Sequence, residues 1–259
     1  MPNDPQRPLR VHLEELRKRL FIVVLVVLLG ASVSVVFFSQ IVDLLLVPSQ
    51  ERLSGTGDGR LVYTELTELL AVTVKVALLG GFVLALPVTV YQIMMFVAPG
   101  LTRRERRLAF LIVPAAPLAF AAGAAFAYSI LLPPILRFLL SYGSDIAVPM
   151  IRVTNYVNVM VTMVFWMGLV FQTPILMFVL AKTGVVAPNT MAQGRRYIVV
   201  LAFVMGAIIT PTFDPLNQAA VAAPLIVLYE IGLWIAKLTR WERKSIWRRN
   251  KAQPTAKDG

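Results

Sequence analysis

The strongest constraint on the fold is a series of long apolar stretches that carry almost no charge. The first, FIVVLVVLLGASVSVVFFSQI, directly follows the highly charged segment VHLEELRKRL at residues 11–20. Because a helix needs about 20 apolar residues to cross the hydrocarbon core of a bilayer, such stretches predict membrane spans. We therefore expect an all-α membrane protein with six transmembrane helices. The expected spans cover residues 21–42, 66–102, 108–136, 153–181, 197–210 and 216–236.

The composition agrees with a membrane protein. Hydrophobic residues make up 58% of the chain, charged residues only 15%, and the mean hydropathy is +0.73. We expect one integral membrane domain over residues 1–259. It comprises an amphipathic helix at 1–20, a six-helix core at 21–236 and a basic, partly disordered tail at 237–259. The last two helices are expected to be short, because a helix over 197–210 would rise only about 21 Å.

The distribution of lysine and arginine predicts the orientation. Twenty of these cations lie in the N-terminal segment, the 97–107 and 182–196 loops and the C-terminal tail, whereas four lie in the connections on the other side. The positive-inside rule then places both termini in the cytoplasm. This distribution also accounts for the net charge of +11 without a nucleic-acid partner.

The sequence gives little support for catalysis or cofactor binding. The chain has no cysteine and one histidine, His12, so thiol nucleophiles and multi-histidine metal centres are excluded. It also lacks a G-x-S-x-G motif and a glycine-rich phosphate loop. We expect a protein that is not an enzyme and holds no metal or cofactor.

Ionisable residues within the spans are sparse. Lys75 and Glu230 lie near the ends of their spans, where long side chains can reach the interface, and Gln172 is polar at lipid depth. A small-solute secondary transporter, the alternative function, would need a polar site at the midplane on broken helices. Only Pro87, Pro174 and Gln172 suggest one.

Two cytoplasmic segments carry most of the polar information. In VHLEELRKRL, the pairs Glu14–Lys18 and Glu15–Arg19 have the i, i+4 spacing that stabilises a helix. In APGLTRRERRL, at 98–108, Glu105 is surrounded by four arginines. Each segment alone has a plain interpretation, as an amphipathic helix with internal ion pairs and as a positive-inside loop.

Together these segments resemble TatC, the polytopic receptor subunit of the twin-arginine protein translocase. The likeness rests on HLEELRKRL at 12–20 and FVAPGLTRRERRL at 96–108. The likeness also includes three later motifs, which are RRY at 195–197, TPTFDP at 210–215 and YEIG at 229–232. The motifs extend over most of the chain in the family's order, and the family also has six spans with both termini inside. The resemblance implies a receptor for twin-arginine signal peptides and a core scaffold for the export of folded proteins. It also implies a multi-pass location in the bacterial cytoplasmic (inner) membrane.

The resemblance assigns the signal-peptide site to the two cytoplasmic segments. Glu15 and Glu105 are the candidate carboxylates, with Leu16, Arg17 and Phe96 as supporting neighbours. A carboxylate can hold a guanidinium through two parallel hydrogen bonds, which lysine cannot reproduce, so two carboxylates would read two consecutive arginines.

The resemblance also implies partners. These are single-span subunits of the TatA and TatB type that dock along the later helices, in a complex with several copies of the receptor. The candidate translocation or partner-contact residues are Pro48, Gln172, Asp214 and Gln218. Gln172 occupies a position where many family members have glutamate, so a role that requires charge is not expected there. Asp214 directly precedes the last expected helix, and capping of that helix is its alternative role.

Overall fold

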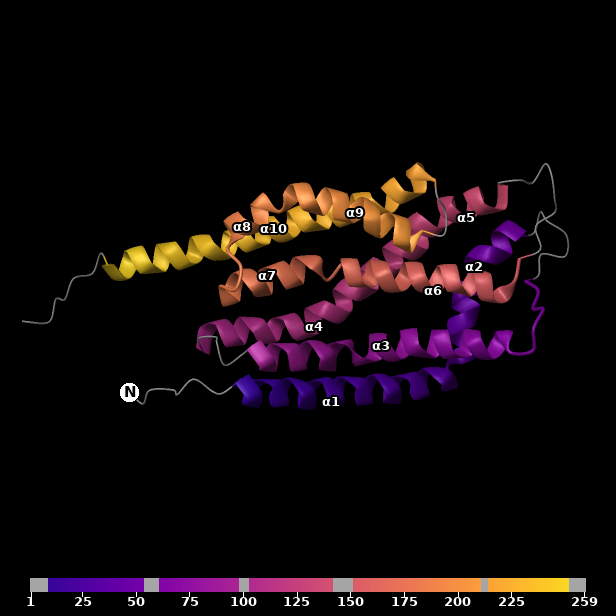
Figure 1. The fold of residues 1–259 in the computed structure, drawn as a ribbon, viewed down its shortest axis with the longest axis horizontal. Coiled ribbons are helices and arrows are strands. Elements are labelled where there is room, and N and C mark those ends of the chain that lie inside the picture. The colour runs from indigo at the N-terminus through magenta and orange to yellow at the C-terminus, as the bar shows by residue number, and fades with distance from the viewer. Residues whose placement is uncertain (1–8, 54–60, 98–102, 142–150, 211–213, 252–259) are drawn as a thin grey trace, which may run out of the picture. The chain divides into compact units, whose positions relative to one another are not determined.

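The computed structural model describes residues 9–53, 61–97, 103–141, 151–210 and 214–251. Its elements are helical (Figure 1), and the one pairing of extended backbone in these ranges is a parallel bridge between Val62 and Arg152. The chain divides into two compact units, residues 1–168 and 169–259. The expectation of a single membrane domain over the whole chain stays a prediction.

The first unit contains a series of long helices. Its elements are α1 (Leu9–Val36), α2 (Phe38–Leu53), α3 (Glu68–Val97), α4 (Arg103–Phe126), the π-helical segment η2 (Ala127–Leu131), α5 (Leu132–Ser141) and α6 (Val153–Val170), whose last two residues belong to the second unit. The helix α1 continues from the charged segment into the apolar run without a break. The helix α2 covers part of the sequence between the first two expected spans, 21–42 and 66–102.

Among its described residues, the second unit contains one long helix and three shorter ones. Its elements are α7 (Thr173–Thr183), α8 (Pro188–Gln193), α9 (Arg195–Ile209) and α10 (Pro215–Lys251). The 15 residues of α9 agree with a short fifth span. In contrast, α10 has 37 residues and continues through much of the expected tail. The reason is that no glycine or proline follows Gly232 until Pro254, and charged residues are good helix formers.

Five helical stretches among the described residues are long and apolar enough to cross a membrane. They are Leu13–Val36, Glu68–Phe96, Ile112–Leu139, Val153–Lys182 and Pro215–Leu238. The third combines α4, η2 and α5, and the fourth combines α6 and α7. The expected span without a counterpart among these five is the fifth, 197–210, which corresponds to α9 and at about 1.5 Å per residue rises only about 22 Å. The structure therefore confirms an all-α protein with membrane-length helices, whereas the count of six spans stays a prediction.

Each unit has its own apolar core. In the first unit, Phe120 of α4 packs with Leu79 and Leu86 of α3. The ring of Phe82 lies 5.9 Å from that of Phe120 and 5.2 Å from that of Phe165. In the second unit the core is formed by Met177, Met191, Leu233 and Ala236. The side chains that face away from these cores are largely apolar and exposed, as expected for helices surrounded by lipid.

Close packing of α1 on α3 depends on glycine. A Cβ atom at Gly81 would lie 2.5 Å from Ala31 N and 2.6 Å from Val27 O, and one at Gly30 would lie 2.9 Å from Gly81 O. Small residues of this kind let helix backbones approach each other closely in membranes. This contact sets the register in which α3 presents its residues to α1.

Candidate functional site

The register of α1 and α3 brings two of the expected receptor residues to the same level. Arg19 Nη1 donates a hydrogen bond to Gln92 Oε1 at 3.1 Å. This pair lies eleven residues before Gly30 in α1 and eleven residues after Gly81 in α3, so the two contacts share one antiparallel register. Glu15 lies four residues before Arg19, and Phe96 lies four residues after Gln92. Since four residues rise about 6 Å in either helix, Glu15 lies at the level of Phe96.

The ion pair expected between Glu15 and Arg19 is confirmed. Arg19 donates from Nε, at 3.2 Å, and from Nη2 to Glu15 Oε1. The side chains of Glu15 and Arg19 are 28% and 19% exposed. Arg19 therefore links the Glu15 carboxylate of α1 to Gln92 of α3 through one partly buried guanidinium.

Glu14, the neighbouring acid, has a different environment. It pairs with Lys18 at 3.8 Å, and the two side chains are 68% and 74% exposed. An exposed pair of this kind contributes little, because water and salt screen it. The two adjacent glutamates thus differ in burial, and the partner of Glu15, Arg19, also bonds to Gln92 of α3.

The other expected receptor residues lie at the same end of the first unit. Figure 1 shows the beginning of α1, the end of α3 and the beginning of α4 at this end. Leu16 is 46% exposed, Arg17 is exposed and Phe96 is half-buried. Glu105 is the third residue of α4, but its side chain lies outside the described residues, as do those of the four arginines around it.

Asp214 caps the last helix. Its Oδ2 atom accepts a hydrogen bond from the backbone N–H of Asn217 at 3.1 Å, and Pro215 occupies the first helical position. Both features are typical of a helix N-terminus. The capping role that the sequence offered for Asp214 is therefore confirmed. Gln218 is half-buried one turn further on, and its carbonyl oxygen would lie 2.8 Å from a Cβ atom at Gly206 of α9.

Gln172 lies at a break in the fourth expected span. It precedes α7, its N–H bonds to Leu169 O at 3.0 Å, and its carbonyl accepts from Leu176 N at 2.9 Å. Pro174 lies at the start of α7, where a missing N–H is tolerated. The half-buried side chain of Gln172 makes no capping bond to its helix.

The two ionisable residues expected within spans both have partners. Lys75 Nζ donates to Asn158 Oδ1 of α6 at 2.9 Å. Glu230 of α10 accepts from Arg195 Nη2 at 2.7 Å, and the neighbouring Tyr229 hydroxyl donates to Met191 O at 2.6 Å. Each residue is thus tied to another helix of its own unit.

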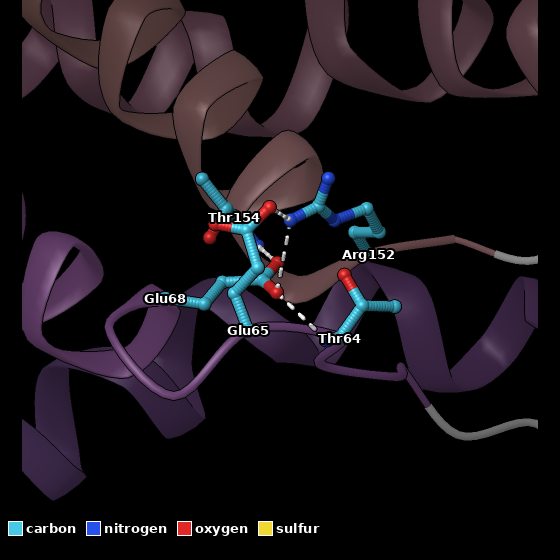
Figure 2. Close-up of polar contacts among 5 residues, drawn as sticks. All are labelled: Thr64, Glu65, Glu68, Arg152 and Thr154. Carbon is cyan, nitrogen blue, oxygen red and sulfur yellow. Dashed lines mark hydrogen bonds and ion pairs between the residues drawn. The ribbon is translucent and has the colours of Figure 1, made fainter.

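A buried carboxylate that sequence reasoning missed lies at the other end of the first unit (Figure 2). Glu68 Oε2 accepts from Thr64 N at 2.9 Å and from Arg152 Nη2 at 3.3 Å, and Oε1 accepts from Thr154 N at 3.2 Å. Arg152 also pairs with Glu65 at 2.9 Å. The side chain of Glu68 is only 2% exposed. These hydrogen bonds satisfy the buried charge and join the start of α3 to the start of α6.

This cluster is suited to holding two chain segments together rather than to chemistry. Val62 donates to Ile151 O at 3.1 Å and accepts from Val153 N at 3.0 Å, so the backbone of the same two segments is also paired. Hydrogen bonds from Arg152 to Glu68 and Glu65 raise the pKa of the Arg152 guanidinium above its usual value. One feature of the sequence could have pointed to this cluster. Glu68 is an acid at the first position of a helix, where negative charge is favourable.

No metal site is formed by the described side chains, since they contain no group of three histidine, cysteine or acidic residues that could hold an ion. The chemistry available at the α1 end is instead recognition of cations by carboxylates.

The chain matches one protein family along most of its length. The sequence profile of the family described as "Sec-independent protein translocase protein (TatC)" matches residues 11–224. The Sec-independent protein translocase protein TatC of Deinococcus radiodurans is 36% identical over 240 residues, which cover 92% of this chain and 89% of that protein. The protein of the same name from Aquifex aeolicus is 37% identical over 241 residues, covering 92% of this chain and 98% of that protein.

The fold is also similar to a solved structure. A crystal structure described as the twin arginine translocase receptor TatC matches with a TM-score of 0.77 at 36% sequence identity. The match covers 88% of this chain and 99% of that chain.

Proposed function

The chain belongs to the TatC family of Sec-independent protein translocase proteins, and we propose that it binds the twin-arginine signal peptides of folded cargo proteins as the core of the translocase. The related crystal structure is described as a twin arginine translocase receptor, which supports this assignment. The alternative of a small-solute secondary transporter is not supported by these relatives.

The signal-peptide site is formed by Glu15 and Glu105, with Leu16, Arg17 and Phe96 around them. The observation that carries this proposal is the Arg19–Gln92 hydrogen bond, because its register puts Glu15 level with Phe96 at the end where α4 begins. One carboxylate from each of the two cytoplasmic segments suits two consecutive arginines. Each guanidinium can make parallel charge-assisted hydrogen bonds to a carboxylate, whereas an ammonium group cannot.

Arg19 occupies the Glu15 carboxylate when no signal peptide is bound. It holds the Glu15 carboxylate with a guanidinium, the same group that a twin-arginine signal supplies. An incoming arginine exchanges with Arg19 at Glu15, while Arg19 keeps Gln92 as a partner. The site is thereby kept paired when no cargo is present, which avoids the cost of a partly buried unpaired charge.

The later helices receive the partner subunits. Single-span proteins of the TatA and TatB type dock along them, with several receptor copies in one complex. In α9, the side chains of Val200, Val204 and Ile208 recur every four residues and are 64%, 50% and 63% exposed. This apolar stripe suits a second transmembrane helix or lipid. Polar contacts to the partners come from Gln172, Asp214 and Gln218. In the first unit, Pro48 is a further candidate for contact with a partner.

The protein lies in the bacterial cytoplasmic membrane with both termini in the cytoplasm. The support is the distribution of cations, with twenty lysines and arginines on the proposed cytoplasmic side against four on the other. This orientation places Glu15 and Glu105 on the face where folded cargo arrives.

Photocross-linking tests the proposed site directly. A photoreactive amino acid is placed at position 15, 105 or 14 of the full chain in membranes, and a twin-arginine signal peptide is added. We expect adducts from 15 and 105, weak adducts from the exposed control position 14, and weak adducts everywhere with a double-lysine peptide. Equal cross-linking from 14 and 15, or an unchanged pattern with double lysine, would contradict the assignment.

A further inference from the structure

Two tyrosines donate hydrogen bonds to neighbouring backbone carbonyls of α2. The Tyr128 hydroxyl donates to Leu44 O at 2.8 Å, and the Tyr156 hydroxyl donates to Leu45 O at 3.2 Å. Tyr128 comes from η2 and Tyr156 from α6, so two separate elements converge on the same turn of α2.

Pro48 explains why a carbonyl is available there. In an α-helix the carbonyl of residue 44 accepts from the N–H of residue 48, and proline has no N–H. The Leu44 carbonyl therefore lacks its regular helical donor, and the Tyr128 hydroxyl supplies one. The donor belongs to a π-helical segment, and such insertions in α-helices are frequent at functional sites.

The tyrosines matter because side chains alone hold α2 weakly. Among the α2 side chains that the structure describes, residues 38–47, only Leu45 is buried, whereas Asp43, Leu44 and Val47 are exposed. Tyr156, in contrast, is only 5% exposed, so its hydroxyl is held in place by packing.

We propose that Tyr128 and Tyr156 are positioning residues that dock α2 on η2 and α6. They do so through the carbonyls of Leu44 and Leu45, one turn before Pro48. Pro48 acts by withdrawing the N–H that would otherwise bond to Leu44 O, rather than by touching cargo itself. This docking goes beyond the signal-peptide site and is independent of it, since its hydrogen bonds join α2 to η2 and α6 and involve no residue of α1 or α3.

Hydrogen exchange of α2 amides tests the docking. The full chain in lipid nanodiscs is compared with Tyr128→Phe, Tyr156→Phe and, as control, Tyr63→Phe, which alters an exposed tyrosine. Loss of one hydrogen bond should speed exchange in peptides from 38–53 by about fivefold for Tyr128→Phe and for Tyr156→Phe. The control should exchange at the wild-type rate, and α1 and α3 should be unchanged in every variant.

The role of Pro48 is tested by combining substitutions. Pro48→Ala restores an N–H that can bond to Leu44 O, so adding Tyr128→Phe to it should speed α2 exchange by less than about twofold. An equal effect of Tyr128→Phe with and without Pro48 would overturn the role of Pro48. Wild-type exchange in Tyr128→Phe, or faster exchange in α1 and α3 as well, would overturn the docking. Cross-linking of a signal peptide at position 15 should persist in all variants, so a failure of the receptor assignment is seen separately.

Discussion

Arg152 Nη2 lies 3.3 Å from the Oε2 atom of Glu68, although 84 residues separate them in the chain. The glutamate side chain is 2% exposed, and the arginine side chain is 36% exposed. Breaking such a pair by removing the cation leaves a buried carboxylate without its charged partner, which costs more than removing both charges.

We therefore expect Arg152→Ala to lower the thermal midpoint of the protein more than the double substitution Arg152→Ala with Glu68→Gln. The physical reason is that glutamine leaves no unpaired buried charge, although its single carbonyl oxygen can accept from only one of the Thr64 and Thr154 N–H groups. Glu65→Gln is the matched control, since the Glu65 side chain is 65% exposed, and it should have a much smaller effect. Thermal unfolding in detergent measures all four proteins, and a double variant less stable than Arg152→Ala would refute this account.

Glu15 and Glu14 offer a matched pair for signal binding. Glu15→Ala should weaken binding of a twin-arginine peptide by about 2–5 kcal/mol, which is roughly thirtyfold or more, because it removes a partly buried carboxylate that faces a guanidinium. Glu14→Ala changes an exposed acid on the same helix and should alter binding less than about fivefold. Peptide titration against the protein in nanodiscs measures both, and similar losses would indicate a general charge effect.

Arg19 should compete with the signal for Glu15. Replacing it by glutamine keeps a donor for Gln92 but removes the internal guanidinium, so a twin-arginine peptide should bind up to about fivefold more tightly. A double-lysine peptide should remain weak, because lysine still cannot make the parallel hydrogen bonds. The same titration decides the matter, and weaker binding in Arg19→Gln would show that Arg19 orders the site instead of occupying it.

Gly81 sets the approach of α1 to α3. Gly81→Ala places a Cβ atom against the α1 backbone and should destabilise the protein by about 1–3 kcal/mol, because backbone atoms cannot move aside as a side-chain tip can. Ala71→Val adds volume at an exposed position of the same helix and serves as the control. Chemical unfolding in mixed micelles measures the difference. Equal stability of the two variants would mean that α1 can move away from α3 without a loss in the free energy of unfolding.

The sequence predicted the elements that depend on apolar length and on local spacing. It located the membrane-length helices, the Glu15–Arg19 pair and the cap at Asp214, because each follows from residues close together in the chain. It missed Glu68 with Arg152, and Tyr128 with Leu44, because these pairs are 84 residues apart and depend on which helices meet. The sequence also predicted a basic tail from residue 237, whereas α10 continues to Lys251. Charged residues end a membrane span, but they do not end a helix.

Asp214 allows a structural role to be separated from a role in translocation. Its carboxylate caps α10 through Asn217, so Asp214→Ala should cost about 1 kcal/mol of stability, whereas Asp214→Asn should cost little because asparagine caps equally well. If capping is the whole role, export of a folded twin-arginine reporter should fall in Asp214→Ala and persist in Asp214→Asn. Loss of export in both variants, with the thermal midpoint of Asp214→Asn unchanged, would show that the negative charge itself acts in translocation. An export assay and a thermal midpoint from the same membranes therefore assign Asp214 to one role or the other.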